Sequence, residues 1–180
     1  MCARQYGFDE NLLYLCRVME IIIVLVEYFK IKKWKYLKGL IIPFLIGITV
    51  YFFTPEKIHV EYFKDFYNSL ISVLGIMIGF TISVFSVLIA MDNKNIREAK
   101  IYTIDVKMYN KRVSLYDSLL INYIYIIIIQ IMLLLANLFV PFFCNISLIL
   151  VSVDIAFLFH IFLAIIRNVV DFYFILTKKN

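Results

Sequence analysis

Long apolar stretches recur along the chain, separated by short polar segments. The clearest covers residues 69–91, which carry no charge. As a helix rising 1.5 Å per residue, this stretch measures about 34 Å, enough to cross a hydrocarbon core of ~30 Å. Comparable stretches cover residues 37–53, 119–143 and 146–167. The pattern predicts an all-α integral membrane protein with four transmembrane helices in a domain of residues 37–180.

The N-terminal segment, residues 1–36, has a different pattern. Its apolar run at 12–29 is interrupted by Arg17, Glu20 and Glu27. A charge at the bilayer centre costs about 2.5–3.5 kcal/mol. The run therefore favours an amphipathic helix lying in the cytoplasmic interface. A further spanning helix is the alternative.

Basic and aromatic residues follow this run. They are typical of the cytoplasmic flank of a spanning helix and can also bind anionic lipid headgroups. The residues of this lipid-headgroup segment are Lys30, Lys32, Lys33, Trp34, Lys35 and Lys38.

In the span that follows, Gly39, Pro43 and Gly47 recur every four residues and predict a shallow groove for the small residues of the next span.

Small residues form one narrow stripe on the second span. Its members, at steps of three and four, are Ser72, Gly75, Gly79, Ser83, Ser86 and Ala90. Ile71, Ile78, Phe85 and Ile89 lie on another face, which suits lipid. Small-xxx-small patterns let helix backbones approach closely. The small stripe therefore predicts helix packing, either within the chain or between copies in a homo-oligomer; lining of a pore is the alternative.

The second span is expected to belong to a longer helix over residues 55–90, because Thr54, Pro55 and Glu56 form a helix-start signal. The polar loop 92–118 is then predicted to be helical. Two capping boxes are predicted in it, Asn95 with Glu98 and Ser114 with Asp117.

Four polar side chains fall inside the third and fourth spans: Gln130, Asn137, Asp154 and His160. Measured from the turn at 141–145, Asn137 lies level with Asp154, and Gln130 lies level with His160. An antiparallel hairpin could pair each set, although the two α-helical faces allow only one pair to meet squarely. Asp154 is the first functional candidate, because an acid inside a membrane is costly; structural hydrogen bonding is the alternative.

Composition and charge agree with a membrane protein. Hydrophobic residues make up 63% and charged residues 17% of the 180, whereas soluble domains carry about half and about a quarter. Of 18 basic residues, 16 precede residue 39, lie within 92–118 or follow residue 166. By the positive-inside rule, both termini and the 92–118 loop face the cytoplasm. The net charge of +5 thus reflects topology, and no nucleic-acid binding is expected.

Motifs for catalysis or metal binding are missing from the sequence. It has no GxSxG, P-loop or HExxH pattern, and its three cysteines, Cys2, Cys16 and Cys144, are far apart. We therefore expect no enzyme activity, no cofactor and no metal.

The tail after Arg167 is expected to continue the last helix along the cytoplasmic surface.

The run NSLISVLGIMIGFTISVFSVLIAMDNKNIREAK, followed by a polar loop and a second hydrophobic hairpin, resembles small multi-pass inner-membrane proteins encoded beside bacterial anti-phage systems. The residues that carry the resemblance are Gly75, Gly79, Phe80, Ser83 and Ser86, followed by Asp92 and Asn93. The resemblance implies an accessory or effector subunit of the bacterial inner membrane that perturbs the membrane when a cytoplasmic partner senses infection. It carries over no catalytic residue.

Three functions are therefore considered. The first is a non-enzymatic, self-associating membrane effector or accessory subunit, pore-forming or membrane-perturbing, coupled to a cytoplasmic protein through residues 92–118. The second is a small transporter or proton-linked channel that uses Asp154 and His160. The third is a membrane anchor that recruits a soluble partner.

Overall fold

The computed structural model describes residues 26, 39–54, 60–108, 111–143 and 147–177. The predicted interfacial helix at 12–29, apart from Val26, lies outside the described residues. So does the whole lipid-headgroup segment at 30–38, together with the predicted helix start at Pro55 and Glu56.

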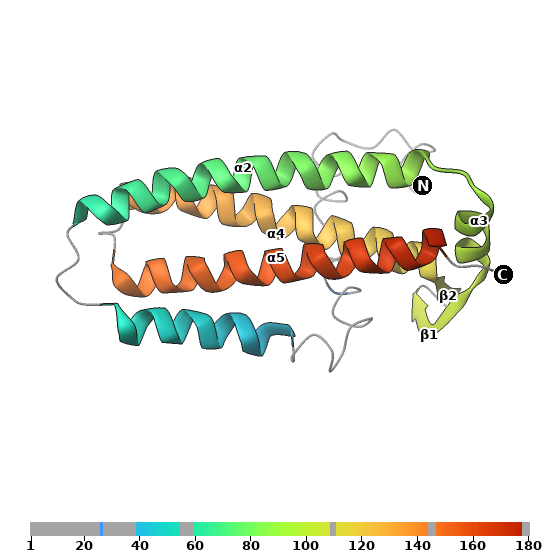
Figure 1. Ribbon diagram of the computed structural model, residues 1–180, viewed down its shortest axis with the longest axis horizontal. Coiled ribbons are helices and arrows are strands. Elements are labelled where there is room, and N and C mark those ends of the chain that lie inside the picture. Colours follow the sequence, from blue (N-terminus) through green and yellow to red (C-terminus); the bar gives the residue numbers. More distant parts are fainter. Residues whose placement is uncertain (1–25, 27–38, 55–59, 109–110, 144–146, 178–180) are drawn as a thin grey trace, which may run out of the picture.

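Three long helices form the body of the protein: α2 (Val60–Ala90), α4 (Leu115–Phe143) and α5 (Leu148–Thr177). They run side by side, with α2 packed on α4 and α4 packed on α5 (Figure 1). Each contains an apolar segment of 25 to 30 residues, long enough to cross a membrane. The prediction of a helical protein suited to a membrane is confirmed for these three helices.

A shorter helix, Gly39–Phe53, lies along α5 on the side away from α2 (Figure 1). At 1.5 Å per residue it is about 22 Å long, less than the hydrocarbon thickness. A fourth span at 37–53 is therefore not confirmed. The expectation that Gly39, Pro43 and Gly47 receive the stripe of α2 is wrong, because Gly47 packs against α5 instead.

The polar segment after α2 differs from its prediction. It contains α3 (Lys94–Ile101) and then an antiparallel hairpin of β1 (Thr103–Met108) and β2 (Lys111–Ser114). Thr103 pairs with Ser114 and Met108 with Lys111, with an irregular register between Thr103 and Lys107. The purely helical prediction for 92–118 is wrong here: the alternating pattern of β1 finds its partner strand immediately downstream.

Two helix caps fix the ends of this segment. The side chain of Asn93, not the predicted Asn95, accepts a hydrogen bond from the Ile96 amide and begins α3. Asn95 donates its side-chain amide to the carbonyl of Leu176 near the end of α5. The capping box at the start of α4 is confirmed: the Asp117 amide donates to Ser114 Oγ at 3.0 Å, and the Ser114 amide to Asp117 Oδ2 at 3.3 Å.

Two buried clusters hold the helices together. One joins the middles of α2, α4 and α5 around Leu74, Tyr125 and Ile161, and the other joins α3 to the adjacent ends of α2 and α4 around Leu88, Ile96 and Tyr123. The tail continues α5 without a break to Thr177, as predicted, but it packs against α3.

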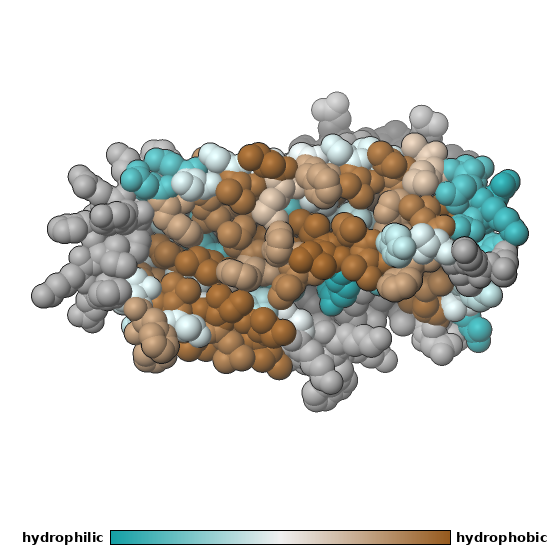
Figure 2. Space-filling model, viewed as in Figure 1, coloured by the Kyte–Doolittle hydropathy of each residue, from teal (hydrophilic) through white to brown (hydrophobic). Residues whose placement is uncertain are grey.

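The outer surface of the long helices is largely hydrophobic. Figure 2 shows this apolar surface extending over α2, α5 and the helix Gly39–Phe53, with hydrophilic residues gathered at the end that carries α3. Large side chains on it are exposed, among them Ile76 (74%), Met132 (62%) and Ile149 (60%). Such a surface is typical of helices whose solvent is lipid.

Candidate functional site

The buried acid Asp154 joins three helices. The hydroxyl of Tyr67 on α2 donates to Asp154 Oδ2 at 2.9 Å, and Asn137 Nδ2 on α4 lies 3.3 Å from Asp154 Oδ1. Asn137 Nδ2 also lies 2.9 Å from the carbonyl of Leu133 on its own helix. The prediction that Asn137 and Asp154 lie at the same depth is thus confirmed, whereas the contact of the Tyr67 hydroxyl with Asp154 was not predicted. Each carboxyl oxygen of Asp154 has a donor, so the group acts as a clamp between helices.

The other predicted pair does not meet. Gln130 Nε2 donates to the hydroxyl of Thr81 on α2 at 3.2 Å, and Thr81 in turn donates to the Met77 carbonyl. His160 instead lies 3.1 Å from the Tyr125 hydroxyl, measured from Nε2. The expectation that only one of the two pairs meets squarely agrees with this geometry. All four intramembrane polar residues are at least nine-tenths buried.

Further buried polar groups lie nearer the α3 end of the helices. Asn122 Oδ1, the Tyr123 hydroxyl and Asn168 Nδ2 make no hydrogen bond within the described part of the chain. Asn168 lies in the tail that sequence reasoning placed on the membrane surface, so its burial (1% exposed) was missed. Its signal in the sequence is the continued apolar period from Ile161 to Phe172.

The small stripe of α2 faces outward. A Cβ added to Gly75 or Gly79 would meet no atom within 4 Å, and all six stripe residues are exposed. The face that packs within the chain carries larger residues, Leu70, Leu74, Thr81 and Leu88, and lies on the opposite side of the helix. The expected packing of the stripe against the first or fourth span of the same chain is therefore wrong for the residues that the structure describes. Ile71, Ile78 and Phe85, assigned to lipid, are in part covered.

The serines of the stripe are satisfied by their own helix. Ser72, Ser83 and Ser86 donate their hydroxyls to the carbonyls four residues earlier, at 2.8 to 3.0 Å. Because these donors are occupied, the serines present a small, weakly polar surface. The stripe is thus an outward face of α2 made of small side chains, exposed with respect to the described part of the chain.

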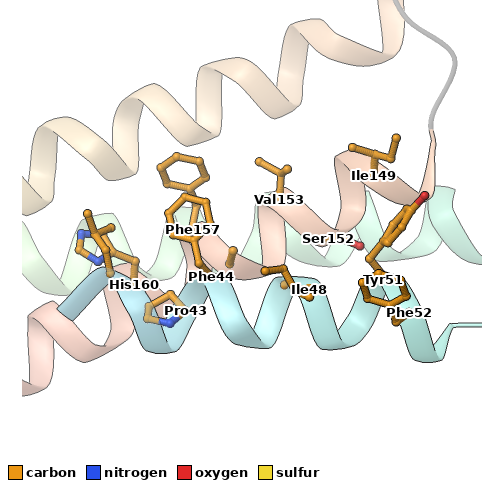
Figure 3. Close-up of a pocket in the computed structure, with 13 residues that line it drawn as sticks. Pro43, Phe44, Ile48, Tyr51, Phe52, Ile149, Ser152, Val153, Phe157 and His160 are labelled. Carbon is orange, nitrogen blue, oxygen red and sulfur yellow. The ribbon is translucent and has the colours of Figure 1, made fainter. Parts of the chain in front are cut away.

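A close contact between small residues joins the helix Gly39–Phe53 to α5. A Cβ on Gly47 would lie 2.8 Å from the Ser152 carbonyl oxygen and 3.0 Å from the Ala156 Cβ. Only glycine allows this approach. Beside the contact, the two helices form an apolar groove of about 240 Å³ (Figure 3). The sequence predicted a shallow groove at Gly39, Pro43 and Gly47, and Pro43 and Gly47 do line this one, but the helix that packs there is α5 and not α2.

Exposed basic residues surround the end that carries α3 and the hairpin. Lys94, Arg97, Lys100 and Arg112 are exposed, Arg97 lies 3.9 Å from the Asp92 carboxylate, and the Lys100 ammonium lies 4.9 Å from the centre of the Tyr116 ring. Ile101 (77% exposed) and Tyr102 (54%) add apolar surface to this end. The arrangement suits contact with an anionic surface or protein.

No group of three histidine, cysteine or acidic side chains that could hold a metal occurs among the residues the structure describes. Comparisons with protein-family models, with curated proteins and with solved structures find no match to this chain.

Proposed function

We propose that this chain is a non-enzymatic membrane subunit whose copies associate through the small stripe of α2. The observation that best supports this proposal is that Gly75 and Gly79 lie exposed in the middle of a membrane-length helix. A Cβ added at either position would meet no described atom within 4 Å. Small residues in membrane helices favour close helix association, because lipid supplies no hydrophobic force that would bring bulkier faces together.

The contact at Gly47 supports this proposal by comparison. Where the helix Gly39–Phe53 packs closely against α5, it uses Gly47 against Ser152 and Ala156. The stripe offers the same residue types, glycine, serine and alanine, with no partner from the described chain. A second copy of α2 presents a matching surface, as a two-fold interface requires.

The stripe serves packing better than a pore in this proposal. The hydroxyls of Ser72, Ser83 and Ser86 donate to their own helix, so a neighbouring helix can approach without leaving these donors unsatisfied. A water-filled pore would gain more from hydroxyls directed away from the helix.

We assign the coupling role to the end formed by α3 and the hairpin. Its exposed basic residues, next to Ile101 and Tyr102, suit an acidic cytoplasmic protein. Together with the resemblance to subunits of anti-phage systems, this surface supports an accessory or effector role in the bacterial inner membrane, with both termini in the cytoplasm.

The transport alternative relies on Asp154 and His160. Asp154 receives donors from Tyr67 and Asn137, and His160 lies within hydrogen-bond distance of Tyr125. These contacts fit residues that hold helices together, so we assign both to structure rather than to ion movement.

The test is a leucine substitution at Gly79, with the neighbouring Phe80→Leu as control. Phe80 is exposed but lies about 100° away from Gly79 around the helix. Gly79→Leu should reduce the mass of the particle in lipid nanodiscs toward one copy, whereas Phe80→Leu should leave it unchanged. An unchanged mass for both variants would remove the stripe from the interface.

A further inference from the structure

We infer that the groove between the helix Gly39–Phe53 and α5 binds an acyl chain of an anionic phospholipid, with the phosphate beside Arg167. This inference concerns the side of the molecule away from α2, and it does not depend on self-association (Figure 1).

The shape of the groove suits a single chain. Its floor is the close contact of Gly47 with Ser152 and Ala156. Figure 3 shows Phe44 and Ile48 on one side, facing Val153 and Phe157 on the other. From Ile149 to His160 the groove follows α5 for about 16 Å, close to half of the ~30 Å hydrocarbon core.

A basic residue lies beyond one end of the groove. His160, 5% exposed, lines both the groove and a second recess, formed with Gly39, Leu163, Ala164 and Arg167. Arg167 Nη1 would lie 3.7 Å from a Cβ on Gly39. Arg167 is about 10 Å further along α5 than His160, toward the end that the charge distribution places in the cytoplasm.

The chemistry at this end favours a phosphate. A guanidinium has five N–H donors in a planar fork that matches phosphate geometry, so Arg167 can bind a phosphate alongside its other contacts. The cation at this end favours an anionic headgroup over a zwitterionic one, which carries its own cation.

The experiment is native mass spectrometry of the full chain in detergent, with either phosphatidylglycerol or phosphatidylcholine of identical chains added. Phosphatidylglycerol should be retained about fivefold more, the effect of one additional charge contact near a surface. Arg167→Gln should abolish this preference and Arg167→Lys should keep most of it. Arg112→Gln is the control, since it removes one exposed cation from the hairpin.

A second pair of variants tests the groove itself. Val153→Phe fills it and should reduce retention of both lipids, whereas Val73→Phe makes the same change at an equally exposed site on α2 and should not. A photo-crosslinking residue at Ile48 should give a lipid adduct. Adducts only to residues 12–29 or to a second copy would overturn the proposal, as would equal retention of both lipids by the natural chain.

Discussion

Asn137 Nδ2 on α4 and Asp154 Oδ1 on α5 lie 3.3 Å apart, and this contact joins the two consecutive helices. Tyr67 brings α2 to the same carboxyl group. A single acid thereby connects all three membrane-length helices. In lipid, such polar contacts are among the few directional forces available for this purpose.

Removing the carboxyl group should destabilise the bundle. Asp154→Ala leaves the Tyr67 hydroxyl and the Asn137 amide without their shared acceptor, at a cost of about 1–3 kcal/mol. The midpoint of thermal unfolding in detergent should fall clearly. Thr49→Ala, which removes an exposed hydroxyl bonded to its own helix outside the stripe, is the control and should leave the midpoint nearly unchanged.

The contact between Tyr67 and Asp154 should appear as a coupling energy. In a double-mutant cycle of Tyr67→Phe and Asp154→Ala, we expect coupling of about 0.6 kcal/mol, the average for hydrogen bonds between membrane helices. Reversible unfolding measures this quantity. Strictly additive effects would show that the two groups do not interact.

The pair Thr81 and Gln130 should show an asymmetric response. Thr81→Val leaves the whole Gln130 amide unpaired, because Gln130 Oε1 already makes no hydrogen bond within the described residues, so unfolding should become easier by about 1–3 kcal/mol. Adding Gln130→Leu removes the unpaired amide and should restore most of this loss. A double variant less stable than Thr81→Val alone would contradict the assigned contact.

The two caps of the α3 end should act separately. Ser114→Ala removes the cap of α4 and Asn93→Ala that of α3, each at about 1 kcal/mol. Hydrogen exchange should accelerate at the start of α4 for the first variant and at the start of α3 for the second. Each variant is the control for the other, and acceleration at the opposite helix would argue against these caps.

Gly47 should be intolerant of any side chain. Gly47→Leu places a side chain where a Cβ alone would lie 2.8 Å from the Ser152 carbonyl oxygen, so the helix Gly39–Phe53 must separate from α5. The distance between spin labels at Ile48→Cys and Val153→Cys, which line the same groove, should lengthen when Gly47→Leu is added. Gly75→Leu is the matched control, since a Cβ there meets nothing within the described chain.

The periodic features of the fold were predictable from sequence. Long apolar runs with few or no charges predicted the helices α2, α4 and α5, and the spacing from the turn predicted that Asn137 and Asp154 lie at the same depth. The capping box of Ser114 and Asp117 also followed from residue types at a fixed spacing. These signals are local or depend on simple helical geometry.

The choice of partner was not predictable. A small stripe indicates that a helix can pack closely, but it does not say against what, so the inward face of α2 was misassigned: Leu74 and Thr81 face inward and Gly79 outward. The hairpin was missed because strand pairing depends on a second segment rather than on the strand itself. Tyr67 was missed because it precedes the charge-free run at 69–91, between Asp65 and Asn68, where nothing in the sequence indicates a contact with a buried acid.

Cross-linking between copies in native membranes tests the central claim most directly. With Cys2, Cys16 and Cys144 replaced, Gly79→Cys should form a disulfide-linked dimer on mild oxidation, whereas Phe80→Cys, equally deep but on a different face, should remain monomeric. Equal cross-linking of both variants, or of neither, would contradict association through the small stripe of α2.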